Sequence, residues 1–263
     1  MVITSKDNES VKHVRKLKDK KSRVEYKEYI VEGVKLIHEA IIMKANIKTI
    51  FVCDDCAESG AIGQKVLYEI AKYNCIYVSE IVFDTMTDVQ THQGILAVIG
   101  IPDSPKEINY NQDVILILDD IQDPGNMGTI LRTADSCGLK QIVASSGSSD
   151  IYNPKVVRAT MGAIFRINVI ESDDILVTMK ILKKHKFKVL ATSLDTDKNI
   201  YDVEYKKVGI VIGNESSGVS RGVLQVADGK IKIPMLGRTE SLNASVATAV
   251  ILYEYVRQKL KKT

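Results

Sequence analysis

VGIVIGNESSG, residues 208–218, is an apolar run that ends in glycine and then becomes polar. The run from Val208 to Ile212 predicts a buried strand, and Gly213 marks the point where the chain leaves the sheet. In open α/β sheets, ligands bind beyond the carboxyl ends of the strands. The polar loop that contains Glu215 is therefore a candidate ligand site.

A second segment of unusual composition is IPMLGRTESLNASVA, residues 233–247. We expect it to start as a short strand, to bend at Pro234 and Gly237, and to enter an apolar helix that runs from about Asn243 to Lys259. Like the first segment, it places small and polar side chains where a core would need bulk. The two segments together predict the walls of one ligand pocket.

Apolar strand patterns alternate with helical patterns along the whole chain, which favours an α/β fold with parallel or mixed sheets. The first part predicts helices at 8–20, 33–43 and 62–73, and strands at 29–31, 47–53, 75–78 and 94–100. The second part predicts strands at 114–118, 141–144, 166–170, 188–192 and 208–212, and helices at 125–137, 154–161, 173–185 and 218–226. Several strands are continuous apolar runs, as expected where helices cover both faces of a sheet.

A linker separates the two parts. The segment IPDSPK, residues 101–106, holds two of the five prolines of the chain. Proline-rich polar segments between periodic stretches are typical of linkers. We therefore expect one domain at residues 1–105 and a second at residues 106–263.

The composition is that of a globular protein. Of 263 residues, 45% are hydrophobic and 26% are charged. No apolar run approaches the roughly 18 residues that a membrane span needs, and the N-terminus lacks the apolar core of a signal peptide. We therefore expect a cytoplasmic protein without membrane contact.

The sequence does not favour a metal site. Cys53 and Cys56 form a CxxC, but no second CxxC or nearby histidine pair completes a zinc site. The four histidines do not cluster in the sequence. Reduced, partly buried thiols are the favoured interpretation, and no bound metal is expected.

Positive charge is concentrated at the N-terminus. Residues 1–27 contain nine Lys or Arg against four Asp or Glu, a local charge of +5, whereas the net charge of the whole chain is +3. A basic arm suits contact with a phosphate backbone, because each neutralised phosphate releases counterions. A solvated helix face would have the same composition, and charge alone leaves both possibilities open.

A third polar segment, DDIQDPGNMGTILRTA, residues 119–134, follows a predicted strand. Gly128 and Arg132 are four residues apart and share a helix face, so a ligand backbone that approaches the glycine is within reach of the guanidinium. Each polar residue also has an ordinary explanation. Asn126 and Asn243 suit helix caps, and Arg132 suits a surface ion pair. Their occurrence together at three strand ends favours a site.

These three segments resemble the motifs of the SpoU (TrmH-type) branch of the SPOUT superfamily of RNA methyltransferases. The motifs are Asn-x-Gly-x-x-x-Arg, Gly-x-Glu, and a proline-led Ser-Leu-Asn-x-Ser-x-Ala. The matching residues are Asn126, Gly128 and Arg132; Gly213, Glu215 and Gly218; and Pro234, Ser241, Leu242, Asn243, Ser245 and Ala247. Residues 29–33 and 92–97 resemble the ribosomal-protein-like RNA-binding domain that precedes the catalytic domain in members that act on ribosomal RNA.

The resemblance implies transfer of a methyl group from S-adenosyl-L-methionine to the 2′-hydroxyl of a ribose in structured RNA, with ribosomal RNA favoured. It implies a SPOUT-type α/β/α sheet with a C-terminal trefoil knot, preceded by a small α/β RNA-binding domain, although knots are otherwise rare. Family members hold the cofactor with backbone groups of the knot loops. Here those loops contain Thr192, Gly213, Ile233 and Leu242.

The resemblance also implies catalytic roles. Arg132 matches the arginine that is proposed to activate the 2′-hydroxyl or to anchor a phosphate, and to act across the interface of a homodimer. Because arginine is a poor base, positioning or stabilisation of the oxyanion is the favoured role. The residues expected to orient Arg132 and the ribose are Asn126, Glu215, Ser241 and Asn243.

Three alternatives stay open at this point. One is a methyltransferase whose substrate is transfer RNA instead of ribosomal RNA. Another is a non-catalytic RNA-binding protein of the same fold. The third alternative is a doubly wound nucleotide-dependent enzyme, which the absence of GxGxxG and Walker-type motifs disfavours. Asn214 departs from the family pattern, because relatives often carry a smaller residue at this position.

Overall fold

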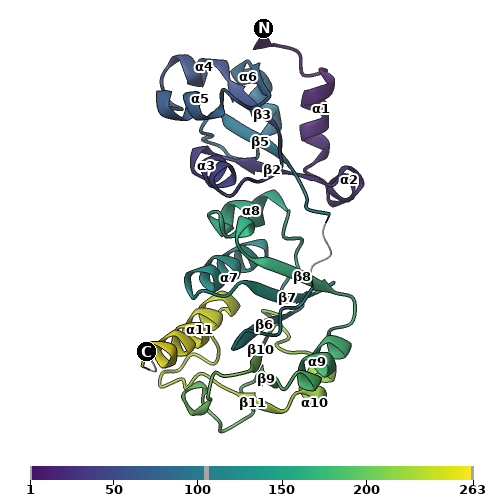
Figure 1. The fold of residues 1–263 in the computed structure, drawn as a ribbon, viewed down its shortest axis with the longest axis vertical. Coiled ribbons are helices and arrows are strands. Elements are labelled where there is room, and N and C mark those ends of the chain that lie inside the picture. Colours follow the sequence, from purple (N-terminus) through teal and green to yellow (C-terminus); the bar gives the residue numbers. More distant parts are fainter. Residues whose placement is uncertain (1, 104–106, 262–263) are drawn as a thin grey trace. The chain divides into compact units, whose positions relative to one another are not determined.

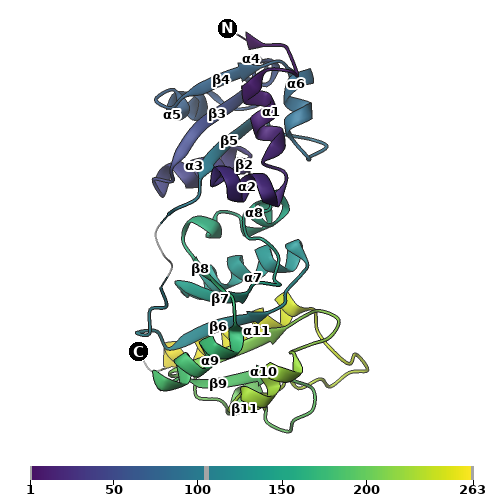
Figure 2. The ribbon, with the colours of Figure 1, turned by 90° about the vertical axis from the view of Figure 1, so that its right-hand side faces the viewer.

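The structure is a computed structural model that describes residues 2–103 and 107–261, and the chain forms two compact units (Figures 1 and 2). The first unit is Met1–Ser104 together with Tyr152–Phe165, and the second is Pro105–Ile151 together with Arg166–Thr263. The predicted boundary between residues 105 and 106 lies outside the described residues. One difference from the predicted domains is that residues 152–165 group with the first unit.

The first unit contains a five-stranded sheet in the order β1-β4-β3-β5-β2. The strands are β1 (Val2–Ile3), β2 (Glu28–Glu32), β3 (Ile47–Cys53), β4 (Cys75–Val78) and β5 (Ile95–Gly100). β4 pairs in parallel with β1 and β3, whereas β5 pairs antiparallel with β2 and β3. The sheet is therefore mixed, one of the two arrangements that the sequence predicts.

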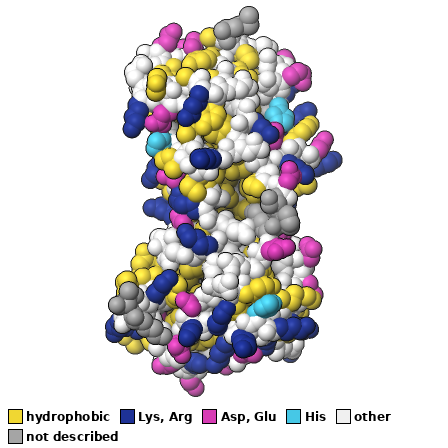
Figure 3. Space-filling model, viewed as in Figure 1, with side chains coloured by type: hydrophobic (Ala, Val, Ile, Leu, Met, Phe, Trp, Pro, Cys, Tyr) yellow, Lys and Arg dark blue, Asp and Glu magenta, His cyan; other side chains and the backbone are white. Residues whose placement is uncertain are grey.

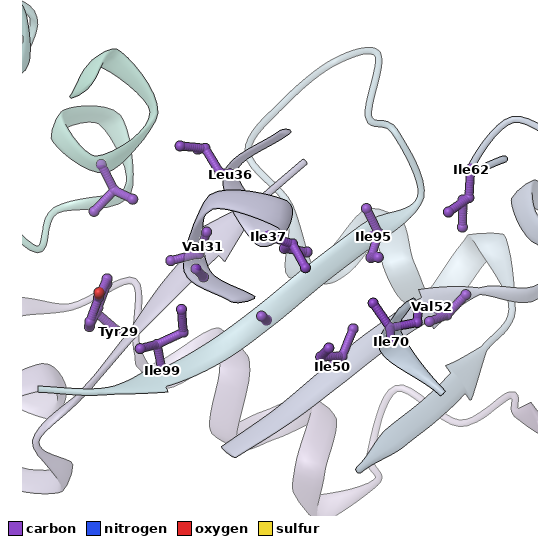
Figure 4. Close-up of a cluster of buried hydrophobic side chains, with 13 residues drawn as sticks. Tyr29, Val31, Leu36, Ile37, Ile50, Val52, Ile62, Ile70, Ile95 and Ile99 are labelled. Atoms are coloured by element: carbon purple, nitrogen blue, oxygen red, sulfur yellow. The ribbon is translucent and has the colours of Figure 1, made fainter. Parts of the chain in front are cut away.

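Helices cover both faces of this sheet, and the strand residues alternate between them. One face packs against α3 (Val34–Ile42), α5 (Gln64–Ile70) and α8 (Pro154–Thr160), as Figure 4 shows for the cluster that contains Ile37, Ile50 and Ile95. The other face packs against α1 (Glu9–Lys16) and α6 (Glu80–Met86). α4 (Asp54–Glu58) follows β3. α4, α6 and β1 are absent from the sequence prediction.

The expected single helix over residues 8–20 is wrong at its end. α1 stops at Lys16, and a separate α2 (Lys20–Tyr26) follows. Arg23 Nη1 donates hydrogen bonds to the carbonyl oxygens of Leu17 (2.9 Å) and Lys18 (2.7 Å). A side chain from α2 thus satisfies carbonyl groups that the end of α1 leaves unpaired.

The second unit is built on a six-stranded sheet in the order β11-β9-β10-β6-β7-β8, in which every pair is parallel. The strands are β6 (Val114–Asp119), β7 (Gln141–Ser145), β8 (Asn168–Ser172), β9 (Lys188–Thr192), β10 (Val208–Gly213) and β11 (Gly229–Ile231). β6 and β10 are buried over their whole length, as their continuous apolar runs predict. The predicted α/β class with a parallel sheet is confirmed.

Two helix pairs cover the second sheet (Figure 1). α7 (Pro124–Ser136) packs against α11 (Ala244–Lys261), and α9 (Ile175–Lys184) packs against α10 (Arg221–Val226). Short 3₁₀ helices lie at Ala163–Phe165 and Ile200–Asp202. The strand expected to start at Ile233 is wrong: β11 ends at Ile231, and the chain is irregular from residue 233 to 243. Within the described residues, every helix is too short or too polar to cross a bilayer.

Candidate active site at the carboxyl ends of β9, β10 and β11

A pocket of about 470 Å³ lies beyond the carboxyl ends of β9, β10 and β11. Its lining comes mainly from residues 192–195, 212–219, 231–235 and 241–247. The sequence-predicted site residues in this lining are Thr192, Gly213, Glu215, Ile233, Ser241 and Leu242. The fold therefore brings both unusual segments of the sequence to one cavity at the end of the sheet where ligands bind.

Gly213 is the tightest point of the pocket wall. A Cβ atom at this position would lie 2.1 Å from the backbone nitrogen of Val219 and 2.2 Å from the carbonyl carbon of Gly218. The loop between them closes on itself, because Asn214 and Gly218 exchange two backbone hydrogen bonds of 3.0 and 2.9 Å. Only glycine fits where two backbone segments approach so closely.

Side-chain hydrogen bonds connect the three polar motifs. Asn126 Nδ2 donates to Glu215 Oε1 at 2.9 Å, and Asn243 Nδ2 donates to Asn126 Oδ1 at 2.9 Å. Asn243 Oδ1 in turn accepts from the backbone nitrogen (2.9 Å) and the hydroxyl (2.7 Å) of Ser245. Residues far apart in the sequence thus form one continuous chain of hydrogen bonds.

Glu215 lies at the amino end of α7. Its carboxylate accepts long hydrogen bonds from the backbone nitrogens of Gln122 (3.5 Å) and Asp123 (3.4 Å). The first turn of a helix has unpaired N–H groups and a positive dipole end, so a carboxylate is stabilised there. Glu215 thus contacts the start of α7, whose residues are far from it in the sequence.

The capping residues are partly different from those that the sequence favours. α7 is capped by Asp123, whose Oδ1 accepts from the backbone nitrogen of Asn126 at 2.7 Å. Asn126 is therefore not the cap, and its side chain is available for Glu215. The Asp-Pro sequence at 123–124 is the signal for this cap, because proline is favoured at the first helical position. Asn243 does cap α11, through Ser245 and Val246.

Asn214 anchors the loop that carries Glu215, a role that the sequence did not reveal. Its Nδ2 donates to the carbonyl oxygen of Asp120 at 2.8 Å, and its Oδ1 accepts from the backbone nitrogens of Ser216 (2.9 Å) and Ser217 (3.1 Å). Asp120 itself adopts a left-handed backbone with φ 62°. The side chain at the position that departs from the family pattern therefore joins the β10 loop to the turn after β6.

Arg132 is placed differently from the other predicted residues. It lies on the exposed face of α7 and does not line the pocket. Among the described residues it forms no ion pair, so the surface pair with a nearby aspartate is not formed. Ser241 is exposed at the pocket lining. Of the residues expected to orient the ribose, Glu215 and Ser241 line the pocket, whereas Asn126 and Asn243 are joined to it through the hydrogen bond from Asn126 to Glu215. Arg132 lies outside both the pocket and this hydrogen-bonded chain.

The basic residues at the N-terminus fall into two groups. Lys12 and Lys27 pair with nearby acids, and Lys18 pairs with Asp88 and with backbone carbonyls. On α1 and α2, four others are exposed and have no acidic partner within the described part of the chain: Arg15, Lys16, Lys20 and Lys21. Lys6, ahead of α1, is exposed in the same way. On the face seen in Figure 3, Lys and Arg side chains are spread among acidic ones, so charge alone does not locate a site.

Cys53, the first cysteine of the CxxC, is a buried free thiol. Burial raises the pKa of the Cys53 thiol to about 12, so this group stays protonated at neutral pH. Its sulfur accepts a hydrogen bond from the backbone nitrogen of Cys56 at 3.4 Å. In residues 2–103 and 107–261, no group of three or more His, Cys, Asp or Glu side chains has the arrangement of a metal site.

Known proteins share both parts of this chain. Residues 113–253 match the model of the SpoU rRNA Methylase family, and residues 8–97 match that of an MRM3-like substrate binding domain. The chain is 31% identical over 252 residues to the 23S rRNA (guanosine(2553)-2′-O)-methyltransferase RlmP of Bacillus subtilis (strain 168). That alignment covers 95% of this chain and 97% of the relative.

Solved structures extend the similarity to the fold of nearly the whole chain. The crystal structure of an RNA 2′-O ribose methyltransferase is 27% identical with a TM-score of 0.86, and the match covers 99% of this chain and 100% of that one. An AdoMet-bound rRNA methyltransferase from Sinorhizobium meliloti is 29% identical with a TM-score of 0.83, and the match covers 99% and 98%.

Proposed function

Because the chain belongs to the SpoU rRNA methylase family, we propose that it transfers a methyl group from S-adenosyl-L-methionine to the 2′-hydroxyl of a ribose in ribosomal RNA. The observation that carries this proposal is the hydrogen-bonded chain of Glu215, Asn126 and Asn243 beside the pocket. A binding protein without chemistry has no need for three polar side chains held in one geometry at a cofactor-sized cavity.

The pocket suits the family's cofactor. Its volume lies in the usual range for small-molecule sites, and the approach at Gly213 leaves backbone groups rather than side chains at the wall. The residues that we propose to hold the cofactor are Thr192, Gly213, Ile233 and Leu242. When bound, S-adenosyl-L-methionine supplies an electrophilic methyl group on its sulfonium.

The protein has to orient a ribose hydroxyl, which is a weak acid and a weak nucleophile. We assign this task to Asn126, Glu215, Ser241 and Asn243. The hydrogen bonds that fix Asn126, Glu215 and Asn243 lower the entropic cost of in-line attack. As the oxygen takes the methyl group, its proton passes to water and S-adenosyl-L-homocysteine is left as the thioether product. Arg132 stabilises the negative charge on the oxygen or anchors the adjacent phosphate. A guanidinium group stays protonated at neutral pH, so it acts as a charge and not as a base.

A homodimer accounts for the position of Arg132 outside the pocket of its own chain. α11 exposes Val246, Tyr253 and Leu260, with exposed fractions of 47%, 54% and 71%. Residues seven apart lie on nearly the same face of a helix, so these side chains form an apolar stripe. α11 packs against α7, which carries Arg132. We propose that a second copy covers the stripe and that each Arg132 serves the partner's pocket.

The first unit, matched over residues 8–97 by a substrate binding domain, is proposed to bind the RNA. Four exposed cations of α1 and α2 without an acidic partner, Arg15, Lys16, Lys20 and Lys21, are the proposed phosphate contacts. Deletion of residues 1–27 would also remove Val11, Val14 and Leu17, which are fully buried core residues. Point substitutions of the four cations are therefore the sharper test.

We further propose that the domains divide at residues 105 and 106, that the chain from β10 to α11 forms a trefoil knot, and that the enzyme works in the cytoplasm. The knot is supported by the backbone approach at Gly213 and by contacts of α11 with both β10 and α7 after the irregular segment 233–243.

The decisive experiment maps 2′-O-methylation in RNA from cells with and without the protein. We expect loss of a methylated ribose in ribosomal RNA, restored by the wild-type gene and not by an Arg132→Ala variant. Loss of a methylation in transfer RNA would favour the alternative substrate. An unchanged methylation map, with no transfer of labelled methyl groups in vitro, would contradict the enzymatic function.

A further inference from the structure

The hydrogen bonds between Glu215, Asn126 and Asn243 have a direction. We infer that these residues form a relay, meaning a chain of hydrogen bonds that all run in one direction, from Asn243 to Asn126 to Glu215. Backbone N–H groups fix both ends of the relay. One remaining N–H of Asn126 and one of Asn243 then donate to an oxygen of the bound ribose. The choice of a ribose oxygen rests on the proposed function. The direction of the relay does not.

The Glu215 end of the relay only accepts. The backbone nitrogens of Gln122 and Asp123 donate to its two carboxylate oxygens, at 3.5 and 3.4 Å. A backbone N–H donates and never accepts, so both oxygens act as acceptors. Asn126 must therefore present its nitrogen to Glu215, which leaves its Oδ1 to face Asn243.

The Asn243 end is fixed by helix capping. Asn243 Oδ1 accepts from the backbone nitrogens of Ser245 (2.9 Å) and Val246 (3.4 Å) and from the Ser245 hydroxyl (2.7 Å). An amide whose oxygen caps a helix has only its nitrogen left for other partners. The capping role thus does not compete with a role in the site. It sets the orientation that the site requires.

Each amide nitrogen carries two hydrogens, and the relay uses one of them. The second hydrogen of Asn126 and of Asn243 has no acceptor among the described residues. Asn126 is only 8% exposed, and a donor in such surroundings is costly to leave unpaired, whereas Asn243 is exposed and its second hydrogen is open to water or to a ligand. Two donors without acceptors suit a ligand oxygen with lone pairs that gains negative charge during the reaction.

Asn243→Asp keeps the helix cap but removes the hydrogen bond that position 243 donates to Asn126. Aspartate caps a helix about as well as asparagine, but it has no N–H to give to Asn126 Oδ1. We expect the melting temperature to fall by about 3 °C, and methyl transfer to fall by roughly tenfold or more. Asn153→Asp is the matched control. Asn153 caps α8 through the backbone nitrogen of Lys155 at 2.9 Å, so the variant adds the same charge at a cap that belongs to the first unit and not to the unit with the pocket.

The double variant Glu215→Gln/Asn243→Asp reverses the relay. The new amide at position 215 donates to Asn126 Oδ1, and Asn126 Nδ2 donates to the new carboxylate, which still caps α11. Each single variant should lower the melting temperature, and we expect the double variant to restore it to the wild-type value. Methyl transfer should stay low, because position 243 no longer offers a donor.

Each result has a distinct meaning. Additive losses of melting temperature in the double variant would overturn the assigned direction. Recovery of full methyl transfer together with stability would overturn the donor role of Asn243. If the wild-type protein transfers no methyl group to any RNA, the proposed function fails, while the recovery of stability still tests the relay by itself.

Discussion

Glu32 and Glu215 occupy similar places in the two sheets, yet only one of them belongs to a site. Glu32 ends β2 directly before Gly33, and Glu215 follows Gly213 at the end of β10. Both glycines are required: Gly33 has φ +100°, and a Cβ at position 213 would lie 2.1 Å from the backbone nitrogen of Val219. Both carboxylates are thus within two positions of a required glycine at the end of a strand.

Their surroundings differ in what remains free for a ligand. Glu32 is 8% exposed, accepts a hydrogen bond from the Thr87 hydroxyl, and lies 3.8 Å from Arg158 Nη1. Glu215 is exposed at the pocket lining and accepts from N–H donors of Asn126 and the turn before α7. A carboxylate that other side chains enclose stabilises the fold. One that organises donors beside a cavity prepares a site.

The largest expected effect is at Gly213. Gly213→Ala places a Cβ 2.1 Å from the backbone nitrogen of Val219, where no flexible side chain can yield. We expect loss of measurable cofactor binding and a decrease of about 1–3 kcal/mol in the free energy of unfolding. Calorimetric titration and thermal unfolding measure both. Gly237→Ala is the control, since its Cβ meets nothing within 4 Å. Normal cofactor binding by Gly213→Ala would contradict the proposed pocket wall.

Arg132→Ala should abolish methyl transfer, with a loss of at least about 100-fold, and leave cofactor affinity nearly unchanged. Mixing this variant with Gly213→Ala tests whether Arg132 acts in the partner's pocket. A mixed dimer then holds one pocket with an intact wall and an intact arginine from the other protomer, so activity should reappear. Mixtures that stay inactive, although mixed dimers form, would place Arg132 at the pocket of its own chain.

Alanine substitutions of the two glutamates separate the packing role from the site role. Glu32→Ala leaves Thr87 and Arg158 without their partner, and we expect the free energy of unfolding to fall by about 2 kcal/mol with kcat preserved. Glu215→Ala should cost less than about 1 kcal/mol, because the residue is exposed, and yet lower kcat strongly. The reverse pattern would show that the comparison of the two carboxylates is wrong.

Local pattern was sufficient for most of the fold. The strands at 47–53, 75–78 and 188–192 have the predicted bounds, because apolar β-branched runs between turn residues leave few alternatives. The pocket was also predictable from the local pattern around Gly213, because polar loops that follow buried strands meet at one edge of a parallel sheet.

What the sequence could not predict depends on contacts between distant residues. α1 ends early because Arg23 of α2 binds the carbonyl group of Leu17. The partner of Asn126 is Asn243, 117 residues away, and no local rule connects them. Asn214 stood out only as a departure from a pattern, because its acceptor on Asp120 lies on another strand end. Long-range hydrogen bonds of this kind leave little trace in a single sequence.

Asn214→Ala should have an intermediate effect. The substitution removes the bond to the Asp120 carbonyl and the two that hold the loop, so Glu215 is less firmly placed against α7. We expect kcat to fall by about tenfold with a small change in KM for RNA. In combination with Glu215→Ala, the loss should not increase further if Asn214 acts through Glu215. Asn111→Ala, in an exposed turn, is the control.

The smallest effects should come from the basic residues of the first unit. Single substitution of Arg15, Lys16, Lys20 or Lys21 by glutamine should weaken RNA binding only about threefold. Each substitution should also reduce the magnitude of the negative slope of log affinity against log salt concentration by about 1. Lys12 and Lys27 are the matched controls, because acidic side chains already neutralise them. At saturating RNA, methyl transfer should be unchanged, since these residues belong to the first unit and the residues that orient the ribose belong to the second. Equal salt slopes for both groups would mean that unpaired charge does not mark the RNA-binding face, and that the first unit recognises RNA through other contacts.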